Sequence, residues 1–353
     1  EVGVLDVGER GQYGLGHLLH ASNAPFSDLE CVVSDLVPVK ATAIVLTGGL
    51  PGVAAAAADR LADMGYTDVS VLAGGNSEWE RSGFELYKGE DVLSKAFGEV
   101  IEANCATPHI SPAQLKAWLD DGHPVRILDV RSPPEHENVC VPGAIGVPNG
   151  ELIHRFGDVV PDPTMPVVTC CAGRTRSIIG AQTLIDAGVP NPVLALSGGT
   201  MGWRMAGYTL ERGSPRSQTG DVRQPYELVP ALQIPFADIP ETVRLVREGT
   251  RTVYLLDVRS EDEFAAGHLP GSRSTPGGQL VQRTGRWCAV RGALLLLIDD
   301  GLCARAAVAG YWLRQMGWDV QRLRLPDDIA FWPAATERHA PGRAPIPAVQ
   351  RIG

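Results

Sequence analysis

The sequence lacks long apolar runs, an excess of positive charge and any regular set of metal ligands. No apolar run is longer than that at residues 293–298, which has the length of a strand, whereas a membrane-spanning helix needs about 20 apolar residues. With 41 acidic and 31 basic side chains, the formal net charge is -10, and proteins that bind nucleic acid need clustered cations to neutralise phosphates. His and Cys residues do not occur at the spacings of metal sites. We therefore expect no membrane, no nucleic-acid partner, no metal and no organic cofactor.

Cysteine is also scarce. There are seven cysteines in 353 residues, an odd number with uneven spacing. They are Cys31, Cys105, Cys140, Cys170, Cys171, Cys288 and Cys303. This pattern favours a reducing compartment over a disulfide framework, so we expect a cytoplasmic protein.

One unit of sequence occurs three times along the chain. An apolar strand that ends in Asp-Val is present at residues 5–7, 128–130 and 256–258. A second block also recurs, made of a buried strand, a turn, an Ala-rich helix and a further strand. Its helices end at Gly65, Gly188 and Gly317, which are suitable C-cap residues. The chain is therefore predicted to contain three similar domains.

Short apolar strands alternate with helices, which predicts an α/β fold in which each domain is a mostly parallel sheet flanked by helices. We expect domains at residues 1–90, 108–213 and 231–335, with a tail or linker at 336–353. Linkers are expected near 89–107 and 213–230, the second being rich in Ser, Pro, Gly and Gln. Because Glu1 opens almost directly on a strand, we expect an N-terminal piece of the first domain to be missing.

The middle copy contains a cysteine loop that points to chemistry. Residues 166–170 are predicted to be a buried strand, and a helix is expected from Ser177 onward. A loop at the carboxyl end of a parallel strand, leading into a helix N-terminus, is where such sheets bind ligands, and its amides can converge on an anion. A cysteine in such a place tends to ionise, and Arg174 and Arg176 could hold an oxyanion. We therefore predict that Cys171 is a nucleophile that attacks or carries an anionic group.

This loop resembles that of the rhodanese family, the thiosulfate and persulfide sulfurtransferases. The family's loop has a cysteine with an arginine five residues later, as Cys171 and Arg176 stand here. The resemblance covers nearly the whole chain as three rhodanese-like domains and is closest to bacterial proteins with several such domains in tandem. It departs from many members at Cys140, where they carry a His.

The resemblance implies a sulfurtransferase. Cys171 would take a sulfane sulfur as a persulfide from a small anionic donor such as thiosulfate, and would pass it to cyanide, a thiol or a protein acceptor. The loop would bind the terminal sulfur, which makes its remaining members the expected substrate-binding residues: Ala172, Gly173, Arg174, Thr175 and Arg176.

The outer copies lack the nucleophile. Alignment on the helix-ending glycines places Gly48 and Asp300 opposite Cys171, and Val53 and Arg305 opposite Arg176. Neither glycine nor aspartate can form a persulfide. We expect both outer domains to be inactive, with roles in docking or in shaping the active cleft.

Three alternatives remain open. Cys170 and Arg176 match the spacing of a cysteine-dependent phosphatase, with Cys170 as nucleophile. The chain could also be a persulfide carrier or sensor that turns over no small donor. Finally, His154 and Arg155, on a predicted helix, could contact the donor or could lie on a solvated helix face.

Overall fold

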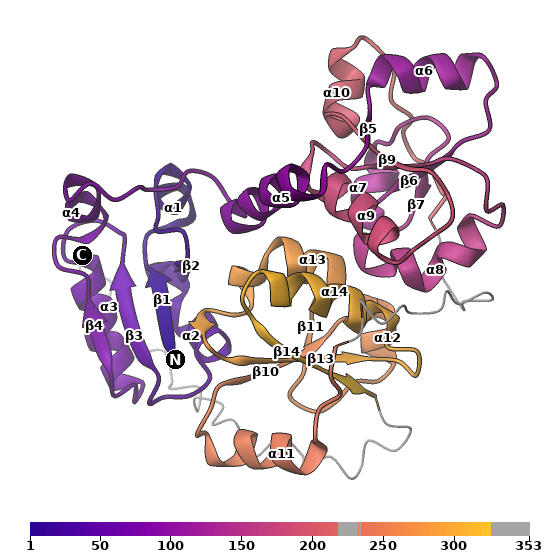
Figure 1. Ribbon diagram of the computed structural model, residues 1–353. Coiled ribbons are helices and arrows are strands. Elements are labelled where there is room, and N and C mark those ends of the chain that lie inside the picture. The colour runs from indigo at the N-terminus through magenta and orange to yellow at the C-terminus, as the bar shows by residue number, and fades with distance from the viewer. Residues whose placement is uncertain (218–231, 233, 326–353) are drawn as a thin grey trace, which may run out of the picture.

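The computed structural model describes residues 1–217, 232 and 234–325, and it contains three α/β units, each with its own mainly parallel sheet (Figure 1). The predicted fold class is confirmed. The expected tail, 336–353, and most of the second expected linker, 213–230, lie outside the described residues.

The first unit has a sheet in the order β1-β3-β4, with β2 paired to β1 and all pairs parallel. Its strands are β1 (Val2–Asp6), β2 (Ser22–Asn23), β3 (Ala43–Thr47) and β4 (Val69–Val71). Its helices are α1 (Arg10–Leu15), the 3-10 helix η1 (Phe26–Asp28), α2 (Leu29–Leu36), α3 (Val53–Asp63) and α4 (Gly75–Arg81).

The middle unit has a fully parallel sheet in the order β5-β9-β8-β6-β7. Its strands are β5 (His109–Ile110), β6 (Arg126–Asp129), β7 (Ile145–Gly146), β8 (Val167–Cys170) and β9 (Val193–Leu196). Its helices are α6 (Pro112–Asp120), α7 (Pro133–Asn138), η2 (Asn149–Glu151), α8 (Leu152–Val159), α9 (Thr175–Asp186) and α10 (Gly199–Met205). The strand β8 is central, so the loop that follows it opens at the middle of the sheet's carboxyl edge.

The third unit has a parallel sheet in the order β11-β10-β13-β14. Its strands are β10 (Val253–Asp257), β11 (Arg273–Ser274), β12 (Val290–Arg291), β13 (Leu294–Asp299) and β14 (Asp319–Arg324). Its helices are α11 (Ile239–Glu248), α12 (Glu261–Ala266), α13 (Gly277–Gln282), η4 (Thr284–Arg286) and α14 (Ala304–Gln315). The short strand β12 leaves this sheet and pairs antiparallel with β1 of the first unit.

The first expected linker, 89–107, is helical over most of its length. It forms α5 (Val92–Cys105), which buries Ser94, Gly98 and Ile101 and lies between the first and middle units (Figure 1). The helix packs closely on α9, because a Cβ at Gly98 would come within 2.6 Å of the Thr175 side chain. The segment is thus a packed element that reaches the start of α9.

The three units share buried contacts. One cluster of buried apolar residues includes members of all three sheets. Between the middle and third units, Trp312 Nε1 donates to Thr183 Oγ1 at 2.8 Å and Tyr311 donates to Asp186 at 2.7 Å. Within the described ranges, no helix has both the length and the apolar character needed to cross a membrane.

Candidate active site

Cys171 is the first residue after β8 and precedes the start of α9 at Thr175. Its side chain is almost fully enclosed, with 2% exposed. The buried hydroxyl of Ser177, in the first turn of α9, donates a hydrogen bond to Cys171 Sγ at 3.0 Å. This bond places a side-chain hydrogen-bond donor directly against the sulfur.

The backbone of the loop is held from two sides. Amides at the start of α10 donate to it, with Thr200 N 2.8 Å from Cys171 O and Met201 N 3.0 Å from Ala172 O. This approach requires Gly199, where a Cβ would lie 2.2 Å from Cys171 O. On the other side, Asn149 Nδ2 donates to Arg176 O at 3.1 Å. The loop is therefore preorganised by the fold around it.

Both loop arginines are paired with glutamates. The Arg176 guanidinium donates to the two Glu135 oxygens at 2.8 Å each. Burial raises the pKa of Glu135, but the Arg176 hydrogen bonds and charge outweigh it and leave that pKa lowered. Arg174 reaches α5, where it pairs with Glu102 and lies 3.3 Å from Glu99. The guanidinium groups expected to hold an oxyanion thus have carboxylate partners beside the loop.

Cys170 lies on the opposite side of the strand from Cys171. It is fully buried in a cluster with Cys140 and Trp203. Burial, together with the nearby Asp129 carboxylate, raises the pKa of the Cys170 thiol well above its ordinary value. A neutral thiol enclosed in apolar side chains is a poor nucleophile, so this environment disfavours the phosphatase alternative.

The Asp-Val-Arg segment at the end of β6 forms a buried ion pair. Arg131 donates to both Asp129 oxygens at 2.9 and 2.6 Å. His136, which the sequence analysis did not single out, lies with Nδ1 3.2 Å from Asp129 Oδ2. Cys140 is fully buried close by. These groups hold the carboxyl end of β6 in place through buried polar contacts.

Comparisons with known proteins identify the family. The rhodanese-like domain family matches residues 1–82, 111–206 and 240–324. The chain belongs to the rhodanese family. The family assignment made from the sequence is therefore confirmed.

Two relatives resemble more than one of these domains. The crystal structure of a thiosulfate sulfurtransferase from Pseudomonas aeruginosa is 42% identical, with a TM-score of 0.86 over 93% of this chain and 64% of that one. This chain thus spans a little less than two thirds of the Pseudomonas protein. SseB of Mycobacterium tuberculosis, named as a candidate thiosulfate sulfurtransferase, is 28% identical over 230 residues, or 54% of this chain and 78% of SseB.

A third relative is named for sulfur carriage. YrkF of Bacillus subtilis, named as a candidate sulfur carrier protein, is 27% identical over 128 residues, which are 34% of this chain and 68% of YrkF.

The loop of the first rhodanese-like domain has no room for a side chain. Gly48, opposite Cys171, has a φ of 77°, and a Cβ there would lie 1.9 Å from Asp6 Oδ1. The Asp6 carboxylate is buried and accepts hydrogen bonds from Gly8 N at 2.9 Å and Asn76 Nδ2 at 3.1 Å. A carboxylate therefore closes the place where a thiol would stand.

The loop of the third rhodanese-like domain is filled by an ion network. Arg305 is fully buried, and its guanidinium donates to Asp299 at 2.9 Å and to Asp300 at 2.8 Å. It also donates to the two oxygens of Glu263, at 2.7 and 3.0 Å, and reaches Glu151 of the middle domain at 3.2 Å. The loop thus helps to join the two domains.

His154 and Arg155 face this interface. Both are buried on α8, which excludes the solvated helix face. His154 Nε2 lies 3.8 Å from Asp300 Oδ2, and Arg155 Nε donates to Glu151 at 2.9 Å. Their position favours a role in domain contact over contact with a donor. Among the described residues, no group of His, Cys, Asp and Glu side chains could hold a metal ion.

Proposed function

We propose that this chain is a rhodanese-type sulfurtransferase that transfers sulfane sulfur through a persulfide on Cys171. The observation that carries the proposal is the setting of Cys171. It is the one thiol among the three equivalent loop positions, it follows the central strand β8, and it accepts a hydrogen bond from Ser177.

The first half-reaction uses an anionic donor such as thiosulfate. The Cys171 thiolate attacks the outer sulfur, a new S–S bond forms on the enzyme, and the S–S bond of thiosulfate breaks. The leaving sulfite takes the bonding electron pair. Backbone amides of residues 172–176, near the N-terminus of α9, would stabilise the charge of the bound persulfide.

The second half-reaction returns the thiolate. A thiophilic acceptor attacks the terminal sulfur, a bond forms between them, and the persulfide bond breaks with its electron pair left on Cys171. Cyanide would leave as thiocyanate, and a thiol would leave as a persulfide. The seven free cysteines agree with a cytoplasmic site of action.

Mass spectrometry of the protein after exposure to thiosulfate tests the proposal. We expect a mass increase of one sulfur atom, mapped to the peptide that contains Cys171. Cys171→Ser should lose this adduct, whereas Cys170→Ser should keep it. An adduct that persists in Cys171→Ser would refute the assignment, and hydrolysis of an aryl phosphate that is lost in Cys170→Ser would favour a phosphatase.

A persulfide carrier is the second candidate, and the similarity to YrkF favours it. A carrier would form the same adduct on Cys171 but would not turn over thiosulfate with cyanide. Steady-state formation of thiocyanate therefore distinguishes the enzyme from the carrier. A Ser177→Ala variant should lower the rate of sulfur loading in either case, because the thiolate loses its side-chain donor.

A further inference from the structure

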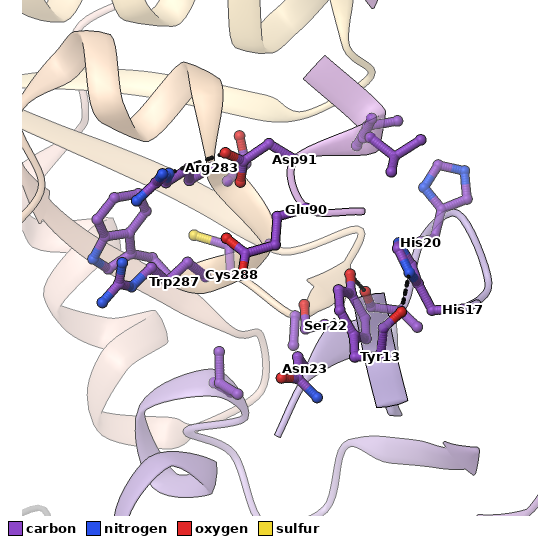
Figure 2. Close-up of a pocket in the computed structure, with 18 of the residues that line it drawn as sticks. Tyr13, His17, His20, Ser22, Asn23, Glu90, Asp91, Arg283, Trp287 and Cys288 are labelled. Atoms are coloured by element: carbon purple, nitrogen blue, oxygen red, sulfur yellow. Dashed lines mark hydrogen bonds and ion pairs between the residues drawn. The ribbon is translucent and has the colours of Figure 1, made fainter. Parts of the chain in front are cut away.

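A cavity of about 480 Å³ lies between the first and third domains, and no residue of the Cys171 loop lines it (Figure 2). Its volume falls within the range of about 300–1000 Å³ that is typical of small-molecule sites. The two domains that form its walls are joined by the pairing of β1 with β12 and by a hydrogen bond from Tyr254 to Leu36 O. The cavity is therefore preformed.

The two walls differ in charge. Of its described residues, the third domain contributes four arginines and no acidic residue to the cavity: Arg273, Arg283, Arg286 and Arg291. The acidic residues come from the first domain and from the segment at the start of α5: Asp28, Asp35, Glu90 and Asp91. Two of the arginines already have partners there, since Arg283 pairs with Asp91 at 3.0 Å and Arg273 lies 3.7 Å from Asp35.

The other two arginines have no carboxylate partner among the described residues. Arg286 is exposed on η4. The Arg291 guanidinium lies over the Trp318 ring, 4.3 Å from its centre, and donates to Met316 O at 3.3 Å. Burial lowers the pKa of Arg291, and burial together with the Arg291 charge lowers the pKa of His20 on the facing wall. Among the described residues, the positive charges of Arg286 and Arg291 are thus not paired with a carboxylate, although Asp28 and Glu90 also line the cavity.

Aromatic rings line the same space. Trp287 lies beside Arg283 on the third-domain side, and Tyr13 and His17 lie on the opposite side (Figure 2). The rings of Tyr13 and His17 are stacked, with centres 3.7 Å apart. A guanidinium group binds carboxylates and other oxyanions through parallel hydrogen bonds, and flat apolar groups pack well against aromatic rings.

We infer that this cavity binds a small organic anion, with its charged oxygen group against the arginine wall and its ring against the aromatic side chains. The site is independent of the sulfur chemistry proposed for Cys171. We expect an organic ligand and not a simple oxyanion, because the cavity has room and aromatic surface for a ring.

Isothermal titration with three probes tests the inference on the full chain. Benzoate carries a charge and a ring, benzamide has the ring without the charge, and acetate has the charge without the ring. We expect benzoate to bind more tightly than both. Arg286→Gln should weaken benzoate binding by about tenfold, as expected for the loss of one charged hydrogen bond. This variant breaks no ion pair between described residues, and Arg247→Gln, at another exposed arginine, is its matched control.

Cysteine labelling locates the bound probe. Cys31 is exposed and lines the cavity, whereas Cys105 is exposed and does not. Benzoate should slow the alkylation of Cys31 and leave that of Cys105 unchanged, as followed by peptide mass spectrometry. Equal binding of benzoate and benzamide, equal effects of the two arginine variants, or unprotected Cys31 would overturn the inference. Sulfur loading of Cys171 should be normal in Arg286→Gln, so failure of one proposal can be distinguished from failure of the other.

Discussion

Replacing Gly48 with alanine should strongly destabilise the first domain. Its φ of 77° costs an L-residue about 1–2 kcal/mol. In addition, the new Cβ would lie 1.9 Å from Asp6 Oδ1. Moving that buried carboxylate breaks at least one of its hydrogen bonds, from Gly8 or Asn76, at a cost of about 1.5–3 kcal/mol. The expected loss in unfolding free energy is therefore about 2.5–5 kcal/mol.

Gly52 supplies a matched control four residues away. Its φ is 87°, and a Cβ there would meet no atom within 4 Å. Gly52→Ala should therefore carry only the backbone cost of about 1–2 kcal/mol. The difference between the two variants, about 1.5–3 kcal/mol, measures the displacement of the Asp6 carboxylate.

Native-state hydrogen exchange is the suitable assay, because a chain of three domains need not unfold in one step. Amides of β1 and β3 should lose more protection in Gly48→Ala than in Gly52→Ala, while amides of β8 stay protected. If the amides of β1 and β3 lost the same protection in both variants, the close approach of Asp6 would not explain why position 48 needs a glycine. A Gly48→Cys variant that folded normally and accepted sulfur would also contradict the reasoning.

Three further predictions concern the ion pairs. Glu135→Gln should free the Arg176 guanidinium for an anionic donor and lower the KM for thiosulfate about threefold to tenfold. Glu137→Gln, at an exposed glutamate, should leave the KM unchanged. An unchanged KM in Glu135→Gln would argue against a role for Arg176 in donor binding. Arg305→Met should destabilise the third domain by about 3–5 kcal/mol, measured by hydrogen exchange, because it leaves buried carboxylates without their cation. Burial raises the pKa of Glu263, but Arg305 outweighs it and lowers that pKa from 4.5 to about 2. The stabilisation from Glu263 is thus complete above pH 4.5 and is lost as the pH falls towards 2, so Glu263→Gln should remove this part of the acid dependence of unfolding.

The repeats and the cysteine loop could be predicted because their signals are local in the sequence. A strand was expected at residues 166–170 and is observed at Val167–Cys170. The following helix was expected from Ser177 and begins at Thr175. The sequence predicts Cys171 as the nucleophile but keeps Cys170 as an alternative, since neighbouring residues at a strand end face opposite sides and the sequence does not say which side is the core.

The partners of the loop arginines could not be predicted. Glu135 lies 41 residues before Arg176, and Glu102 lies 72 residues before Arg174. Such pairs depend on how α7 and α5 pack on the loop, and no periodicity in the sequence reports that packing. The sequence predicts a linker at segment 89–107. It does not reveal that α5 is a packed helix, because the helix on which α5 packs, α9, is distant in the sequence.

Comparison of the middle and third domains separates what the loop arginine does for the fold from what it does for chemistry. Arg176 pairs with both oxygens of Glu135, and Arg305 pairs in the same way with Glu263, although Asp300 replaces the thiol in the third domain. The arginine–glutamate pair therefore fixes the junction between loop and helix with or without a nucleophile. It follows that Arg176 can act on a donor only if it turns from Glu135 or presents an edge that the glutamate leaves free. The KM effect of Glu135→Gln tests this step directly, because a purely structural pair would leave donor affinity unchanged or weaker.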